Sequence, residues 1–152
     1  MTKRELLRGA TGTAERVVGA SDLASALSPD HADHFPEVFA TARMVALMEM
    51  AAARAMAGTL EDGELTAGVS ISVTHSAATP PGLTVRARAR FLGMEGKFYR
   101  FEVFAEDDAG EIGRGLHDRA IVRHARLLEG AERRRPGTGN GKRETENEKQ
   151  SS

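Results

Sequence analysis

The chain has 152 residues, of which 40% are hydrophobic and 28% charged, and its formal net charge is −1 at pH 7. This length and composition fit one globular domain and exclude a disordered or fibrous chain. The balanced charge and the aromatic content of 5% argue against a nucleic-acid partner. Cysteine is absent, which excludes disulfides and thiolate metal sites, and no apolar run is long enough for a membrane span. We therefore expect a cytoplasmic protein with no membrane partner.

A weak strand is predicted at residues 11–18, and the strongest helix signal follows at residues 40–57. This second segment is rich in Ala, Met and Leu and contains neither Gly nor Pro. Thr41 is a plausible N-cap, and Gly58 ends the helix. Apolar residues surround nearly the whole helix apart from one polar stripe through Arg43 and Arg54. This pattern predicts a helix that is covered on most sides.

After the helix the hydrophobic period changes from 3.6 to 2, which indicates β-strands. In the first strand, at residues 68–75, His75 continues an apolar face that begins with Val69. Three more strands are predicted at residues 83–91, 98–105 and 111–123. Their short connections favour antiparallel neighbours, so we expect a four-strand meander beside the helix. The predicted fold class is α+β, and because one sheet cannot cover the helix on all sides, we expect a homodimer.

The C-terminal segment differs in composition from the rest of the chain. Residues 129–152 carry six basic and five acidic side chains and no large apolar one. Such a segment cannot bury enough surface to offset its ordering entropy, so a disordered charged tail is expected there. The folded domain is accordingly predicted to span residues 1–128.

Two polar residues stand out on otherwise apolar surfaces. Glu49 lies on the long helix among apolar neighbours, away from its arginine stripe. A buried carboxylate must be paired, hydrogen-bonded or protonated, so Glu49 is either a structural ion-pair partner or a catalytic base or nucleophile. His75 is either a satisfied core residue or a catalyst. A sheet packed on a helix brings facing residues together, so we expect Glu49 and His75 to form a pair.

Three further residues are candidates with weaker signals. The hydroxyl of Thr41 lies about 12 Å along the helix axis from Glu49, so contact between them requires a bend or a subunit interface. Gly68 is either a strand start or a place where substrate approaches a backbone N–H. Arg119 shares a strand face with His117 and is either solvent-facing, ion-paired or an anion contact.

Other patterns point to structure rather than chemistry. Arg86, Arg88 and Arg90 form a basic strip on one sheet face, which is a solvated face or, alternatively, a coenzyme phosphate site. His31 and His34 have no partners in a metal-binding spacing, so no metal site is expected. No cofactor motif occurs, because the glycines of residues 110–115 follow a turn within the predicted meander.

Several segments together resemble the fluoroacetyl-CoA thioesterase family. They are Phe35-Pro36-Glu37-Val38-Phe39-Ala40-Thr41, Met44-Val45-Ala46-Leu47-Met48-Glu49, Val73-Thr74-His75-Ser76-Ala77-Ala78-Thr79-Pro80-Pro81-Gly82 and Ile112-Gly113-Arg114-Gly115-Leu116-His117-Asp118-Arg119. Their order and spacing match over about residues 11–123. The resemblance implies a hotdog fold, in which an antiparallel sheet wraps a long helix, and assembly as dimers.

The resemblance also implies an activity and a set of site residues. It implies hydrolysis of an acyl-CoA substrate, a short or α-substituted acyl-CoA such as fluoroacetyl-CoA, without a cofactor. The family's active-site Thr, Glu and His match Thr41, Glu49 and His75. Its substrate-contacting Gly, its Arg near the acyl site and its lid Phe match Gly68, Arg119 and Phe35. Two alternatives stay open from the residues: a hotdog enoyl-CoA hydratase or dehydratase, and a non-catalytic acyl-CoA-binding module.

Overall fold

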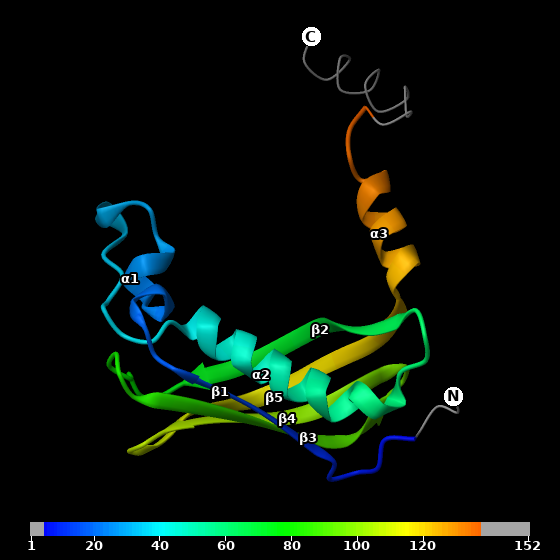
Figure 1. Ribbon diagram of the computed structural model, residues 1–152, viewed down its shortest axis with the longest axis horizontal. Helices are drawn as coiled ribbons and strands as arrows, with labels where there is room; N and C mark the ends of the chain where they lie inside the picture. The colour runs from blue at the N-terminus through cyan, green and yellow to red at the C-terminus, as the bar shows by residue number, and fades with distance from the viewer. Residues whose placement is uncertain (1–4, 138–152) are drawn as a thin grey trace.

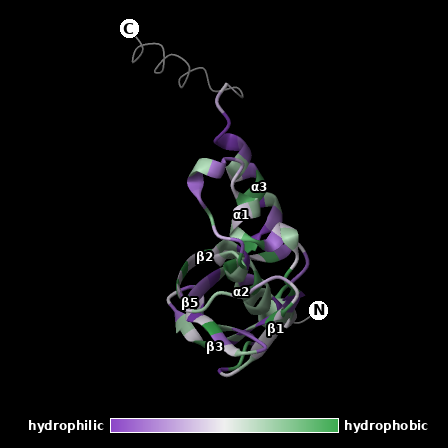
Figure 2. Ribbon diagram, turned by 90° about the vertical axis from the view of Figure 1, so that its left-hand side faces the viewer, coloured by the Kyte–Doolittle hydropathy of each residue, from purple (hydrophilic) through white to green (hydrophobic). Residues whose placement is uncertain are grey.

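The computed structural model describes residues 5–137 and consists of one long helix inside a curled antiparallel sheet (Figure 1). The sheet strands are β1 (Thr11–Val17), β2 (Glu64–His75), β3 (Thr84–Glu95), β4 (Phe98–Asp107) and β5 (Gly110–Arg123). The helices are α1 (Ala24–Leu27), α2 (Thr41–Met56) and α3 (His124–Arg133), with single 3-10 turns at Ala20–Asp22, His31–Asp33 and Ala57–Thr59. Figure 2, seen from one end of the sheet, shows the strands arranged around α2. The predicted α+β class is confirmed.

The order of strands in the sheet is β1-β3-β4-β5-β2, and every neighbouring pair is antiparallel. Only β3, β4 and β5 form a meander, so the predicted four-strand meander is wrong. The segment after His75, which includes the predicted turn at residues 79–82, carries the chain to a different part of the sheet. Local periodicity identifies strands but does not encode their order, and β2 pairs with β5 because the curled sheet must close over both sides of α2.

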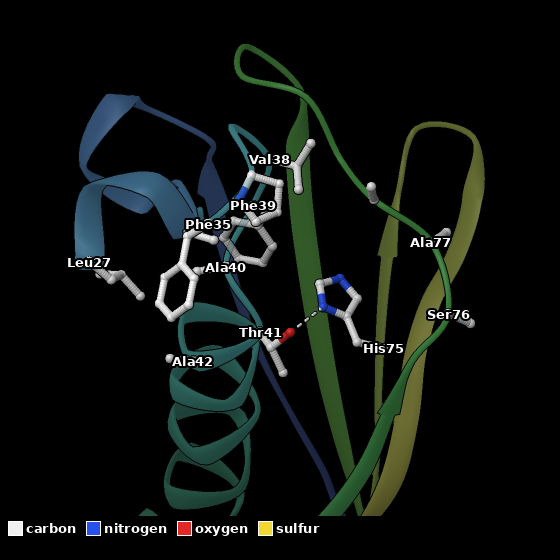
Figure 3. A pocket seen from close by; sticks show the side chains of 13 residues that line it. Leu27, Phe35, Val38, Phe39, Ala40, Thr41, Ala42, His75, Ser76 and Ala77 are labelled. Carbon is white, nitrogen blue, oxygen red and sulfur yellow. Dashed lines mark hydrogen bonds between the residues drawn. The ribbon is translucent and has the colours of Figure 1, made fainter. Parts of the chain in front are cut away.

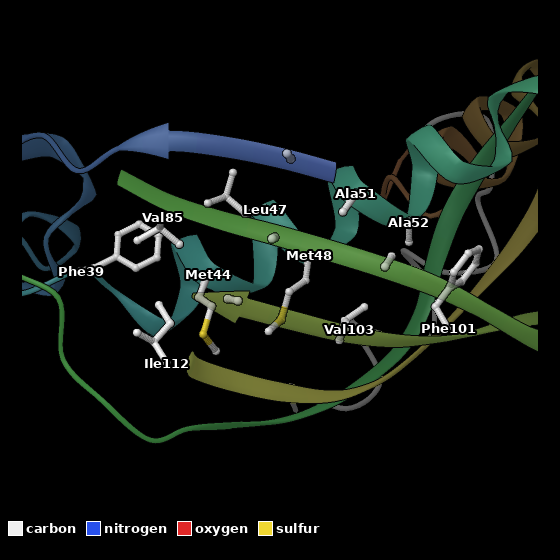
Figure 4. Packing of buried hydrophobic residues seen from close by; sticks show 14 of the residues in the cluster. Phe39, Met44, Leu47, Met48, Ala51, Ala52, Val85, Phe101, Val103 and Ile112 are labelled. Carbon is white, nitrogen blue, oxygen red and sulfur yellow. The ribbon is translucent and has the colours of Figure 1, made fainter. Parts of the chain in front are cut away.

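The core lies between α2 and the concave face of the sheet (Figure 4). Met44, Met48 and Met56 are fully buried on the helix, and the predicted inward face of β3 is confirmed because Val85, Ala87, Ala89 and Phe91 are buried. The helix also lies very close to β1. A side chain at Gly12 would place its Cβ 2.1 Å from the backbone oxygen of Ala51, so only glycine permits this contact.

The start of α2 differs from the prediction in a way that matters for the site. Ala40 is the N-cap and makes no side-chain capping hydrogen bond, whereas Thr41 is the first helical residue. The prediction of Thr41 as N-cap is therefore wrong. Its hydroxyl does not cap the helix and is therefore available for another partner.

The buried carboxylate of Asp22 links the segment between β1 and α2 to both of these elements. Asp22 is fully buried, and its carboxylate lies 2.7 Å from Nε of Arg16 and accepts a hydrogen bond from the backbone N–H of Gly19 at 2.9 Å. Arg43 lies 3.7 Å away on α2. Burial raises the pKa of Asp22, but the hydrogen bonds from Arg16 and Gly19 outweigh it and leave the pKa below its ordinary value. Asp22 therefore ties the segment that carries α1 to both β1 and α2.

Helix α3 extends away from the sheet beyond β5 (Figure 1). It differs from the predicted boundary, because residues 129–133, assigned to the disordered tail, are helical. Ala, Leu, Glu and Arg favour helix, and Arg135 pairs with Glu132 one turn away. The disorder expected for residues 138–152 lies outside the described residues. None of the helices within residues 5–137 is both long and apolar enough to cross a membrane.

Candidate active site

The side chains of Thr41 and His75 meet where the start of α2 lies against the end of β2 (Figure 3). The hydroxyl of Thr41 is 2.8 Å from Nδ1 of His75, although the residues are 34 positions apart. The contact exists because Thr41 occupies the first helical position, where its side chain can turn toward the strand. The structure therefore brings together two of the three residues that the resemblance implies for catalysis.

His75 has the properties of a proton-transfer group. Desolvation by burial lowers its pKa below the ordinary value, and a hydrogen bond involving the backbone of Ala77 offsets only part of this effect. The imidazole is accordingly neutral near pH 7. Its Nε2 is buried and has no hydrogen-bond partner among the described residues. A neutral imidazole with Nδ1 held by Thr41 can accept or donate a proton.

Both residues line a pocket of about 490 Å³ between α2, β2 and the segment that carries α1. The remaining lining is mostly apolar and comes from residues 24–42 and 75–78. Phe35, predicted as a lid, lies over the start of α2 in Figure 3 and is half-exposed at 51%. The pocket thus combines an apolar wall with one imidazole and one hydroxyl.

Glu49 does not contact His75, so the expected pair does not form within one protomer. Its Oε2 instead accepts a hydrogen bond from Nη1 of Arg119 at 3.0 Å, across 70 positions of sequence. The arginine side chain is 7% exposed and the glutamate side chain 43% exposed. Arg119 is held further by Thr66, whose hydroxyl accepts from Nε at 3.1 Å and whose carbonyl accepts from Nη2 at 3.0 Å. Of the open alternatives, Arg119 is therefore buried and ion-paired.

Gly68 provides the space that the Glu49 carboxylate occupies. A Cβ at Gly68 would lie 2.8 Å from Oε2 of Glu49 and 3.4 Å from Nη1 of Arg119. The strand register also shifts between Gly68 and Ser70, which leaves Val69 bulged and exposed. The prediction that Val69 belongs to the inward face is wrong for this reason, while Ile71 and Val73 are partly buried against the core.

The site residues therefore form two clusters in one protomer. One contains Thr41, His75 and Phe35, and the other contains Glu49, Gly68 and Arg119. Thr41 and Glu49 are eight residues apart on one straight helix, which separates their backbones by about 12 Å. Because α2 runs as one helix from Thr41 to Met56, the first route expected from the sequence, a bend at Thr41, is not used.

Sequence reasoning missed one member of the second cluster. His117 is buried and hydrogen-bonded to Arg119, yet it was noted only as sharing a strand face with that residue. The spacing of two along a strand was the available signal, because it places both side chains on the same face.

The arginines of the basic strip on β3 contact other side chains of the sheet. Arg86 pairs with Glu15 at 3.0 Å, and Arg90 pairs with Glu102. The guanidinium of Arg88 lies over the ring of Phe104 at 5.7 Å. Arg86 and Arg90 are thus paired with acidic side chains, and Arg88 contacts an aromatic ring. Within residues 5–137 no group of three or more His, Cys, Asp or Glu side chains could hold a metal ion.

Comparison with known proteins connects this geometry to one family. The family model described as fluoroacetyl-CoA-specific thioesterase matches residues 12–125. A fluoroacetyl-CoA thioesterase from Streptantibioticus cattleyicolor is 54% identical over 95 residues, which are 62% of this chain and 68% of that protein.

Solved structures agree with the sequence matches. A structure of the fluoroacetyl-CoA thioesterase FlK superposes with a TM-score of 0.81 at 42% identity, covering 88% of this chain and all of that one. A thioesterase superfamily member from Thermus thermophilus gives a TM-score of 0.74 at 30% identity, over 86% of this chain and 93% of that one. The hotdog fold expected from the sequence resemblance is confirmed.

Proposed function

The chain belongs to the fluoroacetyl-CoA-specific thioesterase family, and from that membership we propose that it hydrolyses a short or α-substituted acyl-CoA, such as fluoroacetyl-CoA, to the free acid and CoA. As a family member it is a thioester hydrolase. The observation that carries the substrate proposal is the contact of 2.8 Å between Thr41 and Nδ1 of His75 in the lining of a mostly apolar pocket. A pocket of about 490 Å³ holds a small acyl group, while its open side leaves room for the rest of the thioester.

We propose that the working enzyme is a homodimer. Helix α2 carries an apolar stripe that is only partly covered by the rest of the chain and consists of Ala42, Ala46, Met50 and Ala53. Met50 in this stripe is 45% exposed. Beside it β2 is an edge strand, with Val69 47% exposed. An exposed edge next to an exposed apolar stripe invites pairing with a second copy. A twofold axis through β2 would satisfy both surfaces at once.

The same arrangement would complete the catalytic site. If two β2 edges pair antiparallel, the His75 half of one strand lies beside the Gly68 half of the other. The cluster of Thr41, His75 and Phe35 from one protomer then faces the cluster of Glu49, Gly68 and Arg119 from its partner. Two half-sites that are apart in one protomer become one site, which explains why the sequence expectation of a Glu–His pair fails within the single chain.

The proposed chemistry divides the work between the two clusters. Glu49 either removes a proton from water, which then adds to the thioester carbonyl, or attacks that carbonyl itself. The backbone N–H of Gly68 stabilises the developing oxyanion. When water is the nucleophile, the tetrahedral intermediate collapses by breaking the C–S bond, and the proton that Glu49 removed from water passes through the imidazole of His75 to the departing CoA sulfur. When Glu49 itself attacks, CoA departs as the thiolate, and the water that then hydrolyses the anhydride supplies the proton. His75 can also take a proton from the acyl α-carbon when an electron-withdrawing substituent acidifies it. No step requires a cofactor or a metal.

The remaining residues support these steps. Thr41 orients His75 through the 2.8 Å contact with Nδ1. Arg119 holds the Glu49 carboxylate. Phe35 closes the acyl pocket as a lid. A cytoplasmic location is part of the proposal and is supported by the absence of cysteine.

Turnover of a panel of acyl-CoA substrates tests the proposal. Release of free CoA thiol is followed with a thiol reagent for the wild type, Glu49→Gln and His75→Ala, with Arg86→Lys on the outer face as the matched control. We expect both site variants to lose at least about 10²-fold in kcat and the control to retain it. Near wild-type rates in both site variants would overturn the assignment of these residues. Hydration of an enoyl-CoA without thiol release would instead favour the hydratase alternative.

Labelling with ¹⁸O distinguishes the two roles proposed for Glu49. In a single turnover in H₂¹⁸O, direct attack of water places ¹⁸O in the released acid. Attack by Glu49 forms an acyl-enzyme anhydride, and hydrolysis at its enzyme carbonyl leaves ¹⁸O in the Glu49 carboxylate.

A further inference from the structure

His117 is a buried titratable residue that the proposed reaction does not use directly. It lies on β5 with 1% of its surface exposed. Its Nδ1 is 2.8 Å from the carbonyl oxygen of Ser70, and its Nε2 is 3.2 Å from Nη1 of Arg119. The same Nη1 donates to Glu49. His117 is thus one contact away from the carboxylate at the centre of the second cluster.

The partners of His117 define its protonation state. An arginine guanidinium only donates hydrogen bonds, so the hydrogen bond between Nη1 and Nε2 requires Nε2 to carry a lone pair. A carbonyl oxygen only accepts hydrogen bonds, so Nδ1 must carry a proton and donate a hydrogen bond to the carbonyl oxygen of Ser70. Only the neutral Nδ1–H tautomer satisfies both contacts.

The net effect of the surroundings of His117 favours the same neutral state. Burial lowers its pKa most, and the neighbouring Arg119 lowers it further. The Ser70 carbonyl and the carboxylates of Glu49 on α2 and Asp118 on β5 oppose this, and the net effect leaves the pKa below its ordinary value. Asp118 is itself engaged by Arg100 at 2.9 Å. A second proton on His117 would face the guanidinium at 3.2 Å and break their hydrogen bond.

We propose that His117, as the neutral Nδ1–H tautomer, is a positioning residue that fixes Arg119 in the orientation in which Nη1 donates to Glu49. Thr66 holds Nε and Nη2 of the guanidinium, and His117 and Glu49 share the two protons of Nη1. His117 also ties the β2 bulge to β5 through Ser70, next to Gly68, where the carboxylate lies. The effect on rate rests on the proposed function, whereas the hydrogen-bond geometry does not.

The tautomer of His117 can be determined without an enzyme assay. Long-range ¹H–¹⁵N correlation spectra of the wild-type protein distinguish the two neutral tautomers and the imidazolium, and His117→Gln assigns the signal by its loss. His124→Gln, an exposed histidine, is the matched control. We expect the Nδ1–H form of His117 throughout pH 6–8. The Nε2–H form or an imidazolium at neutral pH would overturn the proposal.

Kinetics separate a positioning role from a general structural one. His117→Leu removes the acceptor and is expected to lower kcat about 10²-fold, the scale of a displaced catalytic group. His117→Gln keeps an acceptor toward Arg119 and cannot be protonated, so it retains most of kcat and makes the acid limb of the pH–rate profile less steep. In a Glu49→Gln background, His117→Leu causes no further loss, because the two changes remove the same function.

The outcomes remain distinguishable from failure of the proposed function. Additive losses from His117→Leu and Glu49→Gln overturn the positioning role even if the enzyme is a thioesterase. If the wild-type protein cleaves no thioester, the proposed function is contradicted. The spectra still determine the tautomer of His117 in that case. If His117→Leu does not fold, His117→Gln and the wild-type spectra carry the test.

Discussion

Arg119 and Glu49 are joined by a hydrogen bond of 3.0 Å between Nη1 and Oε2, across 70 positions of sequence and between β5 and α2. The arginine is buried, and Thr66 holds the rest of its guanidinium. The pair therefore has one rigid member and one that is 43% exposed and free to meet a substrate.

Arg119→Lys should lower kcat even though it keeps the positive charge. An ammonium group cannot reproduce the planar fork that binds Thr66 and Glu49 together. We expect a loss of about 10²-fold in kcat, measured by thiol release. Arg86→Lys is the control, because Arg86 pairs with Glu15 on the outer face. Equal rates for Arg119→Lys and the wild type would contradict the role assigned to the fork.

Gly68→Ala should displace the Glu49 carboxylate without unfolding the protein. The new Cβ would lie 2.8 Å from Oε2, which is closer than a Cβ atom approaches a neighbouring heavy atom, so the carboxylate must move. We expect kcat to fall about 10-fold or more. The melting temperature should change little. The control is Gly58→Ala, where a Cβ meets nothing within 4 Å. A fully active Gly68→Ala enzyme would show that Glu49 need not occupy this position.

Acid should destabilise the protein through two histidines before it affects the carboxylates. The pKa values of His75 and His117 are lowered mainly by burial, so the unfolded chain binds more protons than the folded one below about pH 6.5. The free energy of unfolding therefore decreases as pH falls from 6.5 until each folded-state pKa is reached. The lowered pKa values of Asp22 and Asp118 act in a separate window, below their ordinary value of 3.8.

Melting temperatures measured between pH 8 and pH 5 check this dependence. His117→Gln should flatten the decrease, because the variant has one buried titrating group fewer. A wild-type curve that is flat between pH 6.5 and pH 5 would mean that neither imidazole is held neutral.

Asp22→Ala should loosen the segment that carries α1 and Phe35. The change removes a buried acceptor from Arg16 and Gly19. We expect a loss of about 1–3 kcal/mol in the free energy of unfolding, by denaturant titration. KM should rise because Phe35 and its neighbours line the pocket. Asp108→Ala, an exposed aspartate in the β4–β5 turn, should be neutral. A wild-type KM would show that Asp22 does not support the pocket wall.

Met50→Arg should both dissociate the proposed dimer and abolish its thioesterase activity. The side chain is 45% exposed in the single chain and lies in the stripe assigned to the partner. Burying a charge at an apolar interface is unfavourable, so sedimentation should show monomers. Met94→Arg provides the matched control, since Met94 is equally exposed at the end of β3. A fully active monomeric Met50→Arg protein would contradict the composite site.

The elements that sequence reasoning located well are those that local chemistry determines. The long helix was predicted at residues 40–57 and observed as Thr41–Met56, because its composition has no competing strand or turn signal. The four strands after it were identified by their alternation, and His75 was recognised as a polar residue that continues an apolar face.

What escaped prediction depends on contacts between distant segments. The place of β2 beside β5 and the pairing of Glu49 with Arg119 are both set by how the sheet closes. The meeting of Thr41 with His75 depends on the same closure and was expected only from the family resemblance. A period of two shows which face a side chain occupies but not which strand lies next to it. Arg119 illustrates this, since the strand pattern favoured a solvent-facing or an ion-paired side chain without deciding between them and left an anion-binding role as the alternative.

The path of the chain from β2 to β3 has a further consequence, for biogenesis. On the ribosome β2 emerges before β3 and β4, but its only strand neighbour within the described chain, β5, is made last. Until then β2 exposes unpaired backbone groups on both of its edges, a condition that favours aggregation of nascent chains. Hairpins β3–β4 and β4–β5 can form locally, whereas docking of β2 requires a long loop to close. We therefore expect closure of the sheet over α2 to be a late step in folding.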